Sequence, residues 1–191
     1  GCILLRFSKF SGRQEEAHQI NAACEAYRDE VSSEAAQYDM SDYVDLILAV
    51  MMQESSGQGT DPMQSSEGAY NTRYPQQPNG ITDPSYSISC GIQELKYALD
   101  KAGCTGPTDL SKIRLALQAY NFGADSYFAY LEENGQTVWT AQSAQAFAQM
   151  ASGGTQRDED DPLHDPAGPW DYGDQYYPDH VLRYYHLDNN S

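Results

Sequence analysis

The chain has 191 residues, 40% of them hydrophobic, and carries 28 acidic against 11 basic residues, for a formal net charge of −17. This length suits one domain with a buried core, and the negative charge argues against a nucleic acid or an anionic membrane as partner, because both would repel it. No run of 18 apolar residues is present, so no membrane-spanning helix is expected within the chain.

The first part of the chain is rich in Ala and Glu. Residues 14–37 carry apolar side chains at helical spacing and predict one long helix or two short ones. We interpret residues 1–26 as a lead-in helix or linker, residues 27–186 as the main domain, and residues 187–191 as a tail or linker stub.

Residues 44–57, VDLILAVMMQESSG, predict a helix that is apolar nearly all round and therefore buried. We expect Ser41 to cap its start and Gly57 and Gly59 to end it. Glu54 falls on the apolar stripe in the last turn. A carboxyl in partly desolvated surroundings has a raised pKa and stays protonated near neutrality, as a general acid must. Glu54 is therefore the candidate catalytic residue.

A structural role for Glu54 is the competing interpretation. Acids at helix ends often cap loop amides or pair with an arginine, and Arg73 and Arg114 are available for this.

A long loop follows this helix. Residues 55–84 show no sustained hydrophobic period and contain several glycines and prolines. Loops longer than about 12 to 15 residues are uncommon in compact domains and are usually functional. Its hydrogen-bonding and stacking side chains suit a sugar ligand, and the alternative is an ordinary mobile surface loop.

The remaining chain predicts further helices. Apolar residues from Ile88 to Ala102 repeat at helical spacing up to a stop at Gly103, with Ser85 or Ser87 as the N-cap. Gly91 lies inside this helix, where the missing side chain permits a close approach.

Another helix begins at Thr108 or Asp109 and ends in Ala-Tyr-Asn-Phe-Gly at 119–123. Residues 124–133 and 140–150 predict two short helices, and a final short one includes Val181 to Tyr185. Strand-like alternation is scarce, so the fold class is mainly α.

Neither a metal nor a cofactor is expected. The cysteines Cys2, Cys24, Cys90 and Cys104 lack metal-type spacing. Cys90 and Cys104 would lie about 21 Å apart in a helix, too far for a disulfide, whereas Cys2 with Cys24 or a long-range pair stays open. The acidic run 158–161 lacks the spacing of a calcium loop. The histidines form no ligand set; they are His18, His164, His180 and His186.

Four motifs occur in a fixed order: QESSGQGTDPMQSSEG at 53–68, Thr-Asp-Pro-x-x-Ser-Ile at 82–88, AYNFG at 119–123 and YGDQYYPDHVLRYY at 172–185. With them the chain resembles the goose-type lysozyme and lytic transglycosylase superfamily. It is most similar to the bacterial lysozyme-like domain of two-domain cell-wall hydrolases of Gram-positive conjugative elements, which also carry an NlpC/P60 peptidase domain. The resemblance implies a lysozyme-like helical domain with a long functional loop after the central buried helix.

The resemblance also implies an activity. It is that of an N-acetylmuramidase, which cleaves the β-1,4 bond between N-acetylmuramic acid and N-acetylglucosamine in peptidoglycan, with Glu54 as general acid. A lytic transglycosylase, which forms 1,6-anhydro-muramic acid products, and a non-catalytic peptidoglycan-binding module are the alternatives. The expected glycan-binding residues are Gln64, Ser65, Ser66, Ser87, Gln93, Tyr120 and Asn121.

An inverting hydrolase needs a second carboxylate about 6.5 to 9.5 Å from the first. Asp61, Glu67, Asp83 and Glu94 are candidates; we take Asp61 and Asp83 first, although no motif places either.

The implied partner is the glycan strand of peptidoglycan, bound by a monomer. The implied location is the cell wall or the cell exterior, with membrane contact only through segments outside this chain.

Overall fold

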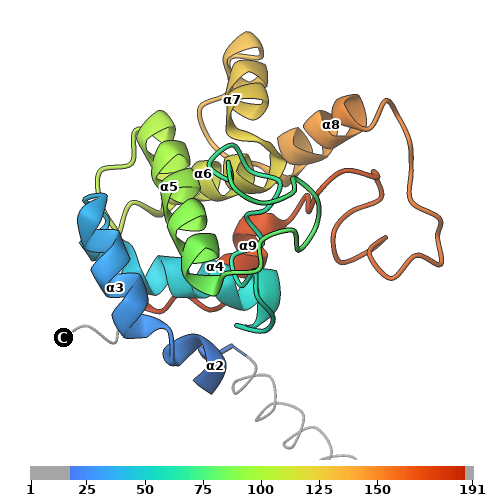
Figure 1. Cartoon of the computed structure of the whole chain (residues 1–191). Coiled ribbons are helices and arrows are strands. Elements are labelled where there is room, and N and C mark those ends of the chain that lie inside the picture. Colours follow the sequence, from blue (N-terminus) through green and yellow to red (C-terminus); the bar gives the residue numbers. More distant parts are fainter. Residues whose placement is uncertain (1–17, 188–191) are drawn as a thin grey trace, which may run out of the picture.

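The computed structural model describes residues 18–187, which form helices and loops without a strand. The mainly α class is confirmed, and an isolated bridge between Gln156 and Trp170 is the sole β-type pairing within that range. The helices, shown in Figure 1, are α2 (Ala22–Glu25), α3 (Arg28–Gln37), the 3-10 turn η1 (Ser41–Tyr43), α4 (Val44–Ser55), α5 (Pro84–Ala102), α6 (Leu110–Phe122), α7 (Ala124–Glu133), α8 (Ala141–Ala151) and α9 (Tyr177–Leu182).

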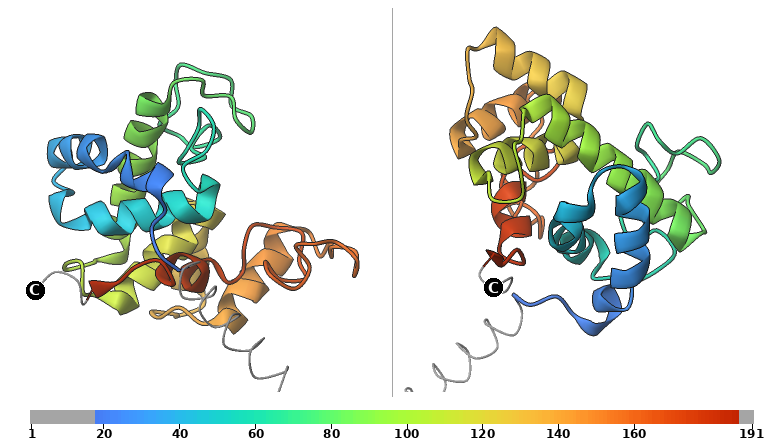
Figure 2. Two further views of the ribbon diagram at one scale, coloured as in Figure 1. Left: turned by 90° about the horizontal axis from the view of Figure 1, so that it is seen from below. Right: turned by 90° about the vertical axis from the view of Figure 1, so that its left-hand side faces the viewer.

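Helix α4 is the buried helix that the sequence predicts. Every side chain from Leu46 to Met51 is fully buried, and α4 packs against α3 and α9. Figure 2 shows α4 enclosed by the blue N-terminal helices on one side and by α9 on the other.

The two ends of α4 differ from expectation. Ser41 does not cap it, because residues 41–43 form a 3-10 turn and the N-cap Tyr43 makes no side-chain capping bond. The left-handed residue at the C-terminal end is Ser56, with φ of 55°, one residue before Gly57. Gly57 still has a specific role, since a Cβ there would lie 2.9 Å from the Cys24 nitrogen.

Helix α5 begins at a different cap from the predicted Ser85 or Ser87. Asp83 accepts a hydrogen bond from the Ser85 amide, and Pro84 occupies the first turn, where its missing N–H costs nothing. The predicted stop at Gly103 is confirmed by its φ of 71°.

Gly91 allows the long loop to pack directly on α5. A Cβ at this position would lie 2.7 Å from the Met63 Cβ. Met63 is fully buried, so the loop is anchored to the helix at this point.

A cluster of aromatic side chains lies between α6, α7 and α8. α6 ends at Gly123 as predicted, and α7 and α8 pack around Phe122, Tyr127 and Phe147. The chain after α8 extends away from the helices before it returns to α9 (Figure 1).

Cys24, Cys90 and Cys104 are free thiols, in agreement with the predicted absence of a bridge between the last two. Cys2 lies outside the described residues. From residue 18 to 187, no helix has both the length and the apolar character needed to cross a bilayer.

Candidate active site

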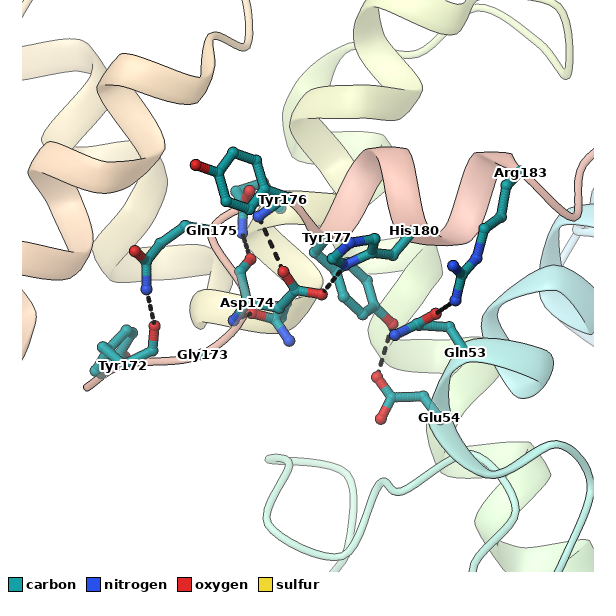
Figure 3. Close-up of polar contacts among 12 residues, drawn as sticks. Gln53, Glu54, Tyr172, Gly173, Asp174, Gln175, Tyr176, Tyr177, His180 and Arg183 are labelled. Atoms are coloured by element: carbon teal, nitrogen blue, oxygen red, sulfur yellow. Dashed lines mark hydrogen bonds and ion pairs between the residues drawn. The ribbon is translucent and has the colours of Figure 1, made fainter. Parts of the chain in front are cut away.

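Glu54 is half-buried in the last turn of α4 and accepts a 2.7 Å hydrogen bond on Oε1 from the Tyr177 hydroxyl of α9 (Figure 3). Tyr177 is itself 1% exposed and stacks against Tyr120, with ring centroids 6.2 Å apart. Two helices distant in the sequence therefore fix one carboxyl oxygen, and among residues 18–187 the other oxygen has no hydrogen-bond partner.

Burial raises the pKa of Glu54 to about 7. The Tyr177 hydroxyl opposes this rise, because its hydrogen bond favours the ionised carboxylate, and the negative charges of Asp174 and Asp61 add to it. Glu54 thus retains its proton close to neutrality, the condition for a general acid.

The arginines that a structural role would require have other partners. Arg114 pairs with Asp179 at 2.6 Å, and the Arg73 guanidinium lies over the Tyr86 ring. Within residues 18–187, neither makes a salt bridge to Glu54.

The segment that leads into α9 lies beside Glu54. The Asp174 Oδ2 lies 2.5 Å from the His180 Nδ1, and its Oδ1 accepts the Tyr176 amide at 2.9 Å. The Asp174 amide in turn donates to the Asn121 side chain at 2.8 Å. Figure 3 shows Asp174, His180 and Tyr177 together beside Glu54.

Sequence reasoning assigned no role to Asp174, Tyr177 or His180. The string YGDQYYPDHVLRYY marked the segment, but nothing in it indicated which side chains turn toward α4. The hydrogen bond between Tyr177 and Glu54 spans 123 residues, which local pattern cannot reveal.

Four of the predicted site residues form a buried network, three of them in the loop and Ser87 on α5. Asp61 accepts hydrogen bonds from the Ser65 and Ser66 amides and from the hydroxyls of Ser66 and Ser87. The Ser65 hydroxyl donates to the Ser87 carbonyl at 2.8 Å. The three serines are at most 1% exposed. As placed here, these side chains hold the loop on α5 rather than face solvent.

The other predicted residues are dispersed. Gln64 is exposed and donates to Asn79, whereas the buried Tyr120 donates to the Met63 carbonyl at 3.3 Å. Gln93 donates to Ser89 at 3.2 Å. Gln93 and the helix cap Asp83 both line a hollow of about 420 Å³, whose other lining residues are Tyr38, Tyr70, Thr72, Arg73, Ser85, Tyr86 and Ser89.

The part of the chain from residue 18 to 187 holds no cluster of His, Cys, Asp and Glu that would bind a metal. The titratable groups near Glu54 are the carboxyl of Asp174, the imidazole of His180 and the phenol of Tyr177.

The family model described as lysozyme-like matches residues 22–185. The chain belongs to the lysozyme-like family. This membership supports the expected glycosidase, and it confirms both the family resemblance and the lysozyme-like fold class inferred from the sequence.

Relatives of this lysozyme-like chain include the bifunctional muramidase/DL-endopeptidase CwlT of Bacillus subtilis (strain 168), which is 36% identical over 91% of this chain and 43% of its own length. A pneumococcal vaccine antigen A homolog of Streptococcus pyogenes serotype M1 is 37% identical over 58% of this chain and 50% of its own.

A solved structure also matches the lysozyme-like fold. It is a protein of Staphylococcus aureus described as similar to a lipoprotein of the NLP/P60 family, with a TM-score of 0.74 and 27% identity. The match covers 91% of this chain and 56% of that one. The lysozyme-like chain therefore spans about half the length of the relatives it matches.

Proposed function

We propose that this chain is a cell-wall glycan hydrolase, an N-acetylmuramidase that cleaves the β-1,4 bond between N-acetylmuramic acid and N-acetylglucosamine. The observation that carries the proposal is the Glu54 carboxyl, half-buried, oriented by Tyr177 and with its pKa raised to about 7. The lysozyme-like family and the muramidase named among the relatives support the same reaction.

Glu54 performs the first chemical step. Its proton passes to the glycosidic oxygen while the bond from that oxygen to the anomeric carbon breaks, through an oxocarbenium-like transition state. The Tyr177 hydroxyl stabilises the carboxylate that Glu54 becomes. A water then adds to the anomeric carbon, loses one proton to solvent and leaves a reducing muramic acid end.

The substrate accounts for where the protein acts. Peptidoglycan lies outside the cytoplasmic membrane, so the protein works in the cell wall or outside the cell. The chain covers 43% of the Bacillus subtilis relative and 56% of the Staphylococcus aureus protein, so the proposal concerns the part that they share with it.

The test is mass spectrometry of the muropeptides released from purified peptidoglycan by the wild-type chain, by Glu54→Gln and by Glu133→Gln. Glu133 is an exposed acid at the end of α7 and serves as the matched control. We expect reducing muramic acid products from the wild type and the control, and at least a 100-fold smaller release from Glu54→Gln, as for loss of a general acid.

Two outcomes would contradict the proposal. Products lighter by one water would identify a lytic transglycosylase, in which the muramyl 6-hydroxyl attacks in place of water. Glycan binding with no release from any variant would identify a binding module.

A further inference from the structure

The hollow of about 420 Å³ lies where the loop after α4 meets the first half of α5. Tyr70, Thr72 and Arg73 line it from the loop, and Tyr38 at the end of α3 lines it opposite them together with side chains of α5. Figure 2 shows the loop beside α5. None of the lining residues is aliphatic, so the hollow favours a polar or charged ligand over an apolar one.

Arg73 is the cation of this hollow, and its guanidinium has no partner of opposite charge. From residue 18 to 187 it makes no salt bridge and donates no side-chain hydrogen bond, whereas Arg28 and Arg114 are held by carboxylates. The chain carries 28 acidic residues, so this isolation does not reflect a shortage of acids. All five N–H donors of the Arg73 guanidinium are therefore available to a ligand.

The loop fixes the position of this guanidinium. It lies 5.0 Å from the centroid of the Tyr86 ring, and the Tyr86 hydroxyl accepts the Thr72 amide at 3.0 Å and donates to the Tyr70 carbonyl at 3.2 Å. Arg73 therefore occupies the ring face on which a sugar would stack. A guanidinium held over an aromatic ring still presents its N–H edge, which matches the two oxygens of a carboxylate.

Asp83 supplies the opposite charge at the same hollow. Its Oδ1 accepts the Ser85 amide, and in the described part of the chain no salt bridge joins Asp83 to Arg73. Opposite charges that line one hollow without pairing suit a ligand that carries both an anionic and a cationic group. A polymer that carries phosphate charges alone would be repelled by the Asp83 carboxylate.

A series of contacts joins the hollow to the last turn of α4. The Asn71 side chain accepts the Arg73 amide at 3.3 Å and donates to the Ser66 carbonyl at 2.7 Å. Ser66 belongs to the buried network that holds the loop on α5. At the start of the loop, the Ser55 hydroxyl of α4 donates to the Pro62 carbonyl at 2.6 Å. One folded loop therefore carries both the end of α4 and the wall of the hollow.

We propose that this hollow binds the stem peptide of peptidoglycan, with Arg73 bound to a carboxylate of that peptide. The inference rests on the proposed function. The glycan strand itself is neutral, because its amines are acetylated and the muramic acid carboxyl is amide-linked to the peptide, so the carboxylates and the free amine belong to the stem. A stem of about four residues extends about 13 Å from the muramic acid, which lets its charged groups reach a hollow beside the glycan.

The first test is isothermal titration calorimetry of the chain with three probes: stem peptide released from peptidoglycan by an amidase, the same peptide with its carboxyls converted to amides, and inorganic phosphate. We expect saturable binding of the native peptide alone. Arg73→Gln should weaken it at least about 10-fold, as for loss of a hydrogen bond between charged groups. Lys101→Gln removes the same charge from an exposed site outside the hollow and should not weaken it.

Thr72→Asp tests the charge of the hollow without removing Arg73. The Thr72 side chain is exposed and makes no hydrogen bond among residues 18–187, so the variant should fold as the wild type does. The new carboxylate would pair with Arg73 and repel the carboxylate of the peptide, so we expect a loss of affinity similar to that of Arg73→Gln. Thr72→Asn adds a side chain of the same shape without the charge and should bind the peptide as the wild type does.

The enzymatic test compares glycan strands that carry stem peptides with strands from which an amidase has removed them. The ratio of the two kcat/KM values measures the preference for the peptide. Arg73→Gln should lower this ratio about 10-fold through a higher KM for the peptide-bearing strands, whereas Lys101→Gln should keep the wild-type ratio.

The inference is overturned if the native peptide does not bind, if the amidated peptide or phosphate binds as tightly, or if Arg73→Gln and Lys101→Gln have equal effects. These outcomes leave the role of Glu54 intact, because release of muropeptides from whole peptidoglycan is measured separately. Full release by Glu54→Gln would instead reject the proposed function, while the calorimetry would still report whether the hollow binds the peptide.

Discussion

The Tyr177 hydroxyl donates a 2.7 Å hydrogen bond to the Glu54 carboxyl and joins the last turn of α4 to the first turn of α9. The bond fixes the orientation of the acid and favours its ionised form. Burial works in the opposite direction and dominates, so the pKa of Glu54 is about 7. Burial therefore favours retention of the Glu54 proton, whereas the Tyr177 hydrogen bond favours its release.

Tyr177→Phe tests this balance. Loss of the hydrogen bond removes the influence that favours the carboxylate, so the pKa of Glu54 should rise further. A hydrogen bond to a charged group contributes about 1.5 to 3 kcal/mol, which corresponds to a shift of about one pH unit or more. The alkaline limb of the pH–rate profile should move up by that amount. Tyr184→Phe, whose hydroxyl has no hydrogen bond in residues 18–187, is the control and should leave the profile unchanged.

The raised pKa values of the half-buried Glu54 and Glu94 make stability depend on pH. The pKa of Glu94 is raised from 4.5 to about 7 in the folded chain, so the native state holds a proton that the unfolded state has lost between these values. Its contribution to stability is present below pH 4.5 and is lost as the pH rises through 7.

Glu94→Gln should therefore match the wild type at pH 4.5 and exceed it at pH 8.5, by up to about 3 kcal/mol. Urea unfolding at the two pH values measures this difference, with exposed Glu67→Gln as the control. Equal stability of Glu94→Gln and the wild type at pH 8.5 would show that Glu94 carries no burial cost.

Asp61 should be essential for the loop rather than for proton transfer. Asp61→Ala leaves two buried amides and two buried hydroxyls without their acceptor, and we expect a loss of at least about 3 kcal/mol. Asp83→Ala removes an exposed helix cap and should cost about 1 kcal/mol. Thermal unfolding compares the two, and a similar loss for both would argue against the buried network.

Gly91→Ala tests the contact between the loop and α5. The new Cβ would overlap Met63, and overpacking of this kind costs about 1 to 3 kcal/mol. Gly106→Ala is the matched control, because its Cβ would meet nothing within 4 Å and its φ is not positive. Equal unfolding temperatures for the two variants would contradict the close packing at Gly91.

The helices could be predicted from the sequence because their signals are local. The apolar run of α4 and the period of α5 each lie within one helix, and Gly103 and Gly123 end helices as expected. The residues that cap the starts of α4 and α5 were harder to predict. Ser41, Ser85 and Ser87 have the right chemistry, but Asp83 with Pro84 competes for the start of α5, and a 3-10 turn takes the place of a capped start at α4.

The burial of Glu54 could be predicted from the sequence, but the residues around it could not. Burial of Glu54 follows from the period of α4, whereas its contact with Tyr177 depends on how α9 returns to the core. The serine hydroxyls are suited to a sugar, but those of Ser66 and Ser87 donate to the buried Asp61, and that of Ser65 donates to the Ser87 carbonyl.

We propose that Glu54 donates a proton near neutrality, and a titration of its carboxyl measures whether the proton is present there. In the chain labelled with ¹³C at the glutamate carboxyls, the NMR signal of Glu54 is identified by its loss in Glu54→Gln. We expect a midpoint of about 7 for this signal. A midpoint near the ordinary value of 4.5 would mean that Glu54 is ionised at neutral pH and would contradict its role as general acid.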